Sequence, residues 1–159
     1  MKITMLGTGY VGLVSGTWFS EFGFDVCCVD KDKDKITNLK QNIIPIYEPG
    51  LENLVKKNKD ANRLTFSNDI KKNIVDADIV FIAVGTPARR GDGHADLSYV
   101  YEAAEEIANN LMGYTLIVNN STVPVGTGNE IKKIIKKTNP KAKFDVVSNP
   151  EFLREGNAI

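Results

Sequence analysis

A glycine-rich turn between a short apolar strand and a helix constrains the fold of this chain more than any other feature. Residues 3–6 are apolar enough for a buried strand, and they run directly into residues 7–12, GTGYVG. Gly7 permits a tight turn off the strand, Gly9 has no Cβ to obstruct a ligand, and Gly12 lets the next helix pack closely on the strand. The N–H groups at the start of that helix attract anions. The sequence therefore predicts a phosphate-binding turn in an α/β fold.

An acidic residue at the end of the second predicted strand makes the glycine turn more specific. Residues 26–29 are apolar, and Asp30 follows them, 18 residues after Gly12. A carboxylate at about this distance is the expected acceptor for the adenosine ribose hydroxyls of a dinucleotide. It also repels a 2′-phosphate, so the sequence favours NAD over NADP. Asp30 could instead cap a helix starting at Lys31, and the two roles are compatible.

Apolar runs of strand length alternate with helical patterns through the whole chain. We expect strands at 3–6, 25–29, 64–66, 79–84, 116–118 and 144–147, and helices at 10–22, 33–41, 51–57, 69–75, 97–111 and 128–137. This alternation is typical of βαβ units and a parallel sheet. With the glycine turn on the first strand, it predicts one α/β domain, a Rossmann-type doubly wound sheet of six parallel strands in the order 3-2-1-4-5-6.

The first helix should bury one face and end at a glycine. Its apolar residues at helical spacing are Val11, Val14, Trp18 and Phe22. These positions predict a stripe that faces the sheet, and Gly23 is a C-terminal stop signal.

Composition and charge argue against several classes of function. The chain is 42% hydrophobic and 25% charged, which is typical of a soluble globular protein. Its 20 basic and 20 acidic residues cancel, so no general attraction to nucleic acid or to a membrane surface is expected. No apolar run approaches the roughly 18 residues of a membrane span. Because the first residues form a predicted core strand, we expect no signal peptide.

Two cysteines and one histidine are available for chemistry, and we expect none of them to be catalytic. Cys27 and Cys28 are adjacent in the second predicted strand. Their side chains should point to opposite faces of the sheet, so we expect buried thiols without a disulfide, in a reducing cytoplasmic setting. His94 lies in a Gly-Asp-Gly loop and should be at the surface. We expect no metal site.

Polar segments with glycine or proline follow the later strands as well. They are residues 85–87 (GTP), 120–127 (NSTVPVGT) and 149–155 (NPEFLRE). Loops are polar in general, which explains each segment singly but explains the set poorly. In a doubly wound sheet, ligands bind at the carboxyl ends of the strands. The segments therefore predict one composite site along that edge.

These strings, in this order, resemble the UDP-glucose/GDP-mannose dehydrogenase family. Besides the glycine turn, the resemblance rests on residues 47–51 (YEPGL), 84–87 (VGTP), 96–100 (DLSYV), 121–127 (STVPVGT) and 149–156 (NPEFLREG), and it covers essentially the whole chain. Residues 63–66 (RLTF) look more like the UDP-glucose branch.

The resemblance implies that a nucleotide sugar is oxidised twice at C6, with two NAD as acceptors and a thioester as intermediate. It implies the following NAD-binding residues: Gly7, Gly9, Tyr10, Val11, Gly12, Asp30, Lys35, Thr86, Ser121, Thr122 and Glu155. Glu151 and Thr122 would be catalytic, Glu151 by accepting a proton from water and Thr122 by placing that water. The substrate would lie along Glu151, Phe152, Leu153, Arg154 and Glu155.

The resemblance also implies that residues 1–159 are the NAD-binding domain of a longer homodimeric enzyme. A central helix and a C-terminal UDP-sugar domain would lie elsewhere, and that part would supply a nucleophilic cysteine, a lysine and an aspartate. An apolar surface around Phe152 and Leu153 would then be uncovered. UDP-glucose is the expected substrate. A sister enzyme acting on GDP-mannose or a UDP-N-acetyl sugar, and a stand-alone NAD-binding module, remain open.

Simpler explanations remain open for three of these residues. Glu151 could only cap a helix starting at Phe152, Thr122 could only cap a helix or close a turn, and Lys35 could be one more solvated lysine.

Overall fold

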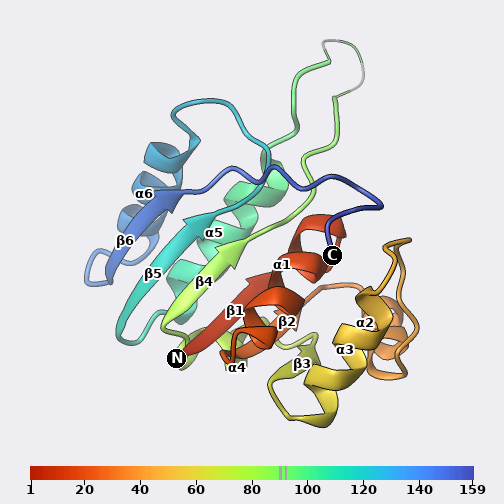
Figure 1. The fold of residues 1–159 in the computed structure, drawn as a ribbon. Helices are drawn as coiled ribbons and strands as arrows, with labels where there is room; N and C mark the ends of the chain where they lie inside the picture. The colour runs from red at the N-terminus through yellow and green to blue at the C-terminus, as the bar shows by residue number, and fades with distance from the viewer. Residues whose placement is uncertain (90, 92) are drawn as a thin grey trace.

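The computed structural model of the chain describes residues 1–89, 91 and 93–159. Six parallel strands form one sheet in the order β3-β2-β1-β4-β5-β6 (Figure 1), which confirms the predicted Rossmann-type order. The strands are β1 (Lys2–Leu6), β2 (Asp25–Val29), β3 (Leu64–Ser67), β4 (Ile79–Ile82), β5 (Tyr114–Asn119) and β6 (Lys143–Ser148).

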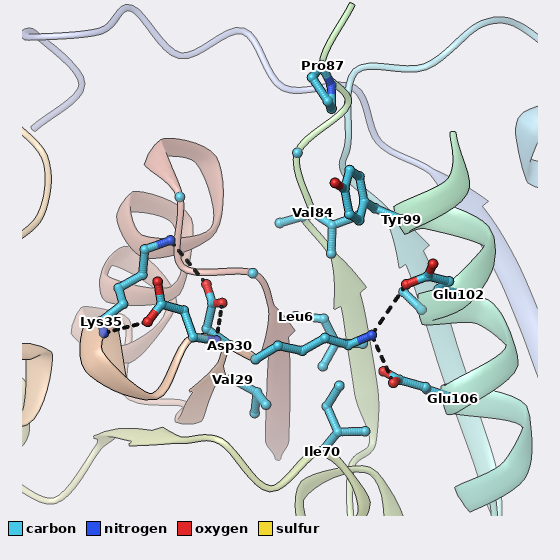
Figure 2. A pocket seen from close by; sticks show the side chains of 17 residues that line it. Leu6, Val29, Asp30, Lys35, Ile70, Val84, Pro87, Tyr99, Glu102 and Glu106 are labelled. Atoms are coloured by element: carbon cyan, nitrogen blue, oxygen red, sulfur yellow. Dashed lines mark hydrogen bonds and ion pairs between the residues drawn. The ribbon is translucent and has the colours of Figure 1, made fainter. Parts of the chain in front are cut away.

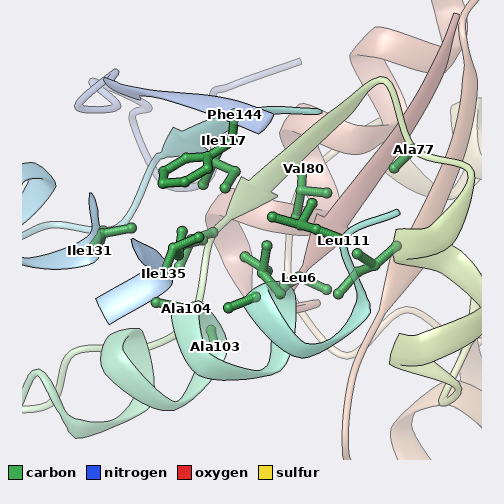
Figure 3. Close-up of a cluster of buried hydrophobic side chains, with 14 of the residues drawn as sticks. Leu6, Ala77, Val80, Ala103, Ala104, Leu111, Ile117, Ile131, Ile135 and Phe144 are labelled. Atoms are coloured by element: carbon green, nitrogen blue, oxygen red, sulfur yellow. The ribbon is translucent and has the colours of Figure 1, made fainter. Parts of the chain in front are cut away.

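The helices cover both faces of the sheet. One face packs against α1 (Tyr10–Glu21), α2 (Lys33–Lys40) and α3 (Leu51–Asp60), and the other against α4 (Ile70–Val75), α5 (Ser98–Asn110) and α6 (Thr127–Thr138). Successive side chains of a strand point to opposite faces, so each strand contributes to two cores. Figure 3 shows the core on the α5 and α6 side, where Ile117 and Phe144 of the sheet meet Ile135.

The two cysteines lie on opposite faces of β2, as predicted. Cys28 is fully buried in the core under α1, whereas Cys27 packs against the core on the other face. Both are free thiols. Burial raises the pKa of the Cys27 thiol and of the Cys28 thiol, so neither side chain is readily converted to a nucleophilic thiolate.

The predicted inward stripe of α1 is wrong at its end. Phe22 lies just beyond the helix and is 68% exposed, with its ring stacked on Trp18. The helix approaches the sheet through small residues instead: a Cβ on Gly16 would lie 2.6 Å from Cys28 Sγ. This close approach turns Leu13, Val14 and Thr17 inward and leaves Phe22 at the rim. Gly23 follows with a positive φ, as expected of a helix stop.

Strand β4 ends at Ile82, two residues before the predicted end. Its neighbour β1 turns away at Gly7, so only the Ala83 N–H still reaches a β1 carbonyl, that of Leu6. The loop that contains His94 follows at residues 88–95, and residues 90 and 92 of it lie outside the described residues. Ala88 pairs with Ala95 across this loop, and His94 is exposed, as predicted.

The chain after β6 does not form the helix that the capping explanation of Glu151 requires. Residues 149–159 contain no helix, and they run back along the carboxyl-end edge of the sheet to finish beside α1 (Figure 1). Trp18 of α1 donates its indole N–H to the Ala158 carbonyl at 3.2 Å. The last segment of the chain therefore lies against the helix that follows the glycine turn.

Candidate dinucleotide site

A cleft of about 640 Å³ opens at the carboxyl ends of β1, β2 and β4 (Figure 2). Four of the predicted cofactor residues line it: Gly7, Gly9, Asp30 and Lys35. Leu6, Val29 and Ile70 contribute apolar surface below. Val84 and Pro87 contribute it from the loop after β4, and Tyr99 contributes it from α5. The cleft thus joins the glycine turn to Asp30, as the sequence predicted.

The three glycines of the turn differ in what a side chain would meet. Gly7 has a φ of +103°, and a Cβ there would lie 2.4 Å from the Ala83 carbonyl oxygen. A Cβ on Gly12 would lie 2.0 Å from the Gly7 carbonyl oxygen. Gly9 has no neighbouring atom within 4 Å of its Cβ position. Gly7 and Gly12 therefore serve the fold, and Gly9 leaves open space beside the cleft.

The start of α1 is suited to a phosphate. Its N-cap is Gly9, no side chain caps the helix, and its first turn carries no acidic residue. The first N–H groups of a helix lack intrahelical partners and carry the positive end of the helix dipole. The open space at Gly9 and these donors fit the pyrophosphate of a dinucleotide.

Asp30 is held in place by donors from the glycine turn and from α2. Its Oδ2 accepts hydrogen bonds from the Thr8 N–H at 2.9 Å and the Thr8 hydroxyl at 2.6 Å, and it lies 3.3 Å from Lys35 Nζ. Asp32, not Asp30, is the N-cap of α2, so the capping explanation of Asp30 is wrong. The contact with Asp30 also rules out the explanation of Lys35 as a merely solvated lysine.

The donors around Asp30 set its charge state. Burial alone would raise its pKa, but the hydrogen bonds from Thr8 and the Asp32 N–H, with the Lys35 ammonium, lower the pKa below the ordinary value of 3.8. A lowered pKa in the folded state means that ionised Asp30 stabilises the fold above pH 3.8. That stabilisation is lost as the pH falls through the folded-state pKa.

An NMR titration of the Asp30 carboxyl carbon should therefore give a midpoint below 3.8. In Thr8→Val the midpoint should rise toward 3.8, because the variant keeps the side-chain shape and removes the hydroxyl donor. A midpoint at or above 3.8 in the unaltered chain would contradict this assignment of the hydrogen bonds.

Sequence reasoning missed an ion-pair cluster across the cleft. Lys31 follows the end of β2, and its Nζ lies 3.0 Å from Glu106 Oε1 and 3.5 Å from Glu102 Oε2. Figure 2 shows these two glutamates on α5. The charges of residues 31–35 alternate in sign, which is the pattern of a solvated face and carries no sign of such a cluster. The predicted strand order did contain a signal for this cluster. It places β4 next to β1, so that α5, the helix after β4, follows a strand that ends beside β1. Thr8 was also missed.

The predicted residues after β4 and β5 hold two loops together. Thr86 donates its hydroxyl to the Thr122 carbonyl at 2.9 Å, and Ser121 donates its hydroxyl to the Val84 carbonyl at 2.8 Å. Ser121 is buried and Thr122 is exposed. Gly126 is the N-cap of α6, so Thr122 does not cap that helix. Thr86 lies between Gly85 and Pro87, which line the cleft, but Thr86, Ser121 and Thr122 are not themselves among the lining residues.

The predicted substrate segment lies beyond β6. Glu151 is half-buried, and its Oε2 accepts the Leu153 N–H at 2.8 Å. Phe152 is 90% exposed, as expected of an uncovered apolar surface, but Leu153 packs against the core under α1, so that half of the expectation is wrong. The Tyr10 hydroxyl contacts the Arg154 carbonyl at 3.0 Å.

Four more residues that were predicted to bind the cofactor also lie outside the cleft lining: Tyr10, Val11, Gly12 and Glu155.

None of the described helices is long and apolar enough to cross a membrane.

Comparison with known proteins gives a consistent result. The family model for the NAD binding domain of the UDP-glucose/GDP-mannose dehydrogenase family matches residues 1–159. UDP-glucose 6-dehydrogenase of Rhizobium meliloti is 65% identical over 159 residues, which are 100% of this chain and 36% of the relative. UDP-glucose 6-dehydrogenase TuaD of Bacillus subtilis is 58% identical, over 99% of this chain and 34% of the relative. The chain thus spans little more than a third of these relatives.

Solved structures of the same kind share the fold. A UDP-glucose dehydrogenase from the archaeon Pyrobaculum islandicum superposes with a TM-score of 0.94 at 37% identity, over 99% of this chain and 37% of that one. A GDP-mannose dehydrogenase from Pseudomonas aeruginosa, solved as a ternary complex, gives a TM-score of 0.93 at 37% identity, over 98% of this chain and 37% of that one.

Proposed function

The chain belongs to the UDP-glucose/GDP-mannose dehydrogenase family as its NAD-binding domain, and we propose that it is the cofactor-binding part of a UDP-glucose 6-dehydrogenase. Such an enzyme converts UDP-glucose to UDP-glucuronate in two oxidations. The choice of UDP-glucose is supported by the two relatives of that name, at 65% and 58% identity. Two free cysteines support a cytoplasmic location. The homodimer expected for the whole enzyme stays a prediction.

The observation that carries the proposal is the cleft between the glycine turn and Asp30. Bound NAD would supply the acceptor for hydride at each oxidation. The N–H groups at the start of α1 would hold its pyrophosphate over Gly9, and Asp30 would accept hydrogen bonds from the adenosine ribose. Lys35 lies beside Asp30 and fixes the orientation of the carboxylate. Thr86 and Ser121 would border the cofactor at the ends of β4 and β5.

The water chemistry would fall to Glu151 and Thr122. A thioester at C6 needs an activated water, and a positioned carboxylate can accept the proton of that water. The Leu153 N–H holds one oxygen of Glu151 in place, and the exposed Thr122 hydroxyl could orient the water. The segment from Glu151 to Glu155 would border the sugar.

Calorimetric titration of the 159-residue chain with NAD and with NADP tests the cofactor assignment. NAD should bind, and NADP should bind much more weakly because Asp30 repels the 2′-phosphate. Asp30→Ala should weaken NAD binding by about 1.5–3 kcal/mol, the scale of hydrogen bonds to a charged group.

Asp34→Ala is the matched control, since Asp34 is exposed on α2 and does not line the cleft. It should leave NAD affinity unchanged. Equal affinities of the unaltered chain for NAD and NADP would refute the ribose role of Asp30.

A further inference from the structure

The Tyr-Glu-Pro-Gly-Leu segment, residues 47–51, has no part in the cleft, yet it contains a buried carboxylate. Glu48 is 7% exposed. Its Oε1 accepts the Ala158 N–H at 2.7 Å, and its Oε2 accepts the Gly156 N–H at 2.8 Å and contacts the Tyr10 hydroxyl. Burying a carboxylate costs free energy unless hydrogen-bond donors contact it. Here residues 156 and 158 supply two of those donors, so the connection between α2 and α3 is bonded to the last segment of the chain.

Tyr10 joins that carboxylate to the glycine turn. It is the first residue of α1, directly after Gly9. Its hydroxyl oxygen contacts the Glu48 carboxylate and lies 3.0 Å from both the Arg154 carbonyl oxygen and the Gly156 nitrogen. One tyrosine therefore has its backbone in the dinucleotide turn and its hydroxyl on the segment that follows Glu151.

The protonation states suit these bonds. Burial, and then the hydrogen bond with Glu48, raise the pKa of Tyr10 to about 12, so the phenol keeps its proton at neutral pH. Burial alone would raise the pKa of Glu48, but the Tyr10 hydroxyl and the N–H groups of Ala158 and Gly156 lower it below its ordinary value. A neutral phenol thus donates toward an ionised carboxylate, which is a strong kind of hydrogen bond.

We propose that Tyr10 and Glu48 are a positioning pair that couples occupation of the dinucleotide turn to the conformation of residues 151–158. This inference rests on the proposed function, in which the turn holds NAD and residues 151–155 border the sugar. The N–H groups that would meet the pyrophosphate belong to the same helical turn as the Tyr10 backbone. A ligand that holds the first turn of α1 in place therefore also holds the Tyr10 ring in place. The Tyr10 hydroxyl and the Glu48 carboxylate in turn hold the Gly156 N–H. Because coupling between two sites is reciprocal, ordering of residues 151–158 strengthens NAD binding by the same factor by which NAD binding favours the ordered segment.

Amide hydrogen exchange of Gly156 and Ala158, measured by NMR on the 159-residue chain, tests the coupling. Saturating NAD should slow exchange at both amides about five-fold or more, the lower end of ordinary coupling. In Tyr10→Phe, the same factor should be lost from NAD affinity, so NAD should bind about five-fold or more weakly, and saturating NAD should no longer slow exchange at the two amides.

Trp18→Phe is the control, because it removes the other hydrogen bond to this segment, at the Ala158 carbonyl, from a residue two turns along α1. It should raise basal exchange and keep the NAD effect. Should Tyr10→Phe fail to fold, Glu48→Gln carries the same expectation. NAD binding without slowed exchange, or an unchanged NAD effect in both variants, would overturn the coupling. Calorimetry separates those results from a failure of NAD to bind at all, which would overturn the proposed function and the coupling together.

Discussion

A valine at position 9 should abolish NAD binding while the chain still folds. Gly9 has no neighbouring atom within 4 Å of its Cβ position, and its φ of −73° is open to any residue, so the fold itself has room for a side chain. That room is where the pyrophosphate would approach the start of α1. We expect calorimetry to show at least about a 100-fold loss of NAD affinity, which is about 2.7 kcal/mol. Circular dichroism should be unchanged.

Gly12→Val is the contrasting variant. Its Cβ would meet the Gly7 carbonyl oxygen at 2.0 Å, a backbone atom that cannot move without opening the turn. We expect it to lower the free energy of unfolding by about 3 kcal/mol or more, measured by urea denaturation. If a folded Gly9→Val variant bound NAD normally, the turn would be a structural corner only, and the proposed function would lose its main support.

The fold was predictable because its signals are local and repeated. Alternating apolar runs and helical patterns specify βαβ units, and the right-handed crossover leaves few ways to order six parallel strands. The errors lie where tertiary contacts decide. Phe22 fits the helical stripe of α1, but the small residues Gly12 and Gly16 bring another face of the helix onto the sheet. No periodicity argument contains that information.

The sequence predicted a site residue correctly only where that residue type, at that place in the motif, has one common role. Asp30 after an apolar strand and Gly9 at the turn are of this kind, and both line the cleft. Lys31 and Glu48 are not, since lysines and glutamates occur mostly on solvated surfaces. Their partners are remote in sequence: Glu106 in one case, and Ala158 in the other. Only the strand order and the path of the last segment bring them together.

The 159-residue chain alone should produce no NADH from UDP-glucose and NAD. The proposed thioester needs an accessible thiolate, and the chain offers only Cys27 and Cys28. Both belong to β2, Cys28 is fully buried, and burial raises the pKa of each thiol. Absorbance at 340 nm should therefore stay at background while calorimetry shows bound NAD. Robust UDP-glucose-dependent NADH production by this chain would overturn the proposal that a second part supplies the nucleophile.

A chimera with the remaining part of a relative tests whether this chain supports activity once the nucleophile is supplied. The Rhizobium meliloti relative is 65% identical to this chain over its matching 36%, so its remaining part can be fused after residue 159. The fusion should oxidise UDP-glucose, because the cofactor domain and the nucleophile would then be in one molecule. The same fusion carrying Gly9→Val should be inactive, which shows that the activity uses the NAD site of this chain.

Within that active chimera, Glu151→Gln should separate oxidation from hydrolysis. Glutamine keeps the shape of the side chain and can still accept the Leu153 N–H that holds Glu151 in place, but it cannot take a proton from water. Turnover should fall by roughly 10²- to 10⁴-fold, the usual contribution of a general base. In the proposed function Glu151 acts on the water that hydrolyses the thioester, so a covalent sugar-nucleotide adduct should build up on the cysteine. Mass spectrometry of the protein after mixing with UDP-glucose and NAD would detect it. Slow turnover without an adduct would show that Glu151 acts before the thioester forms.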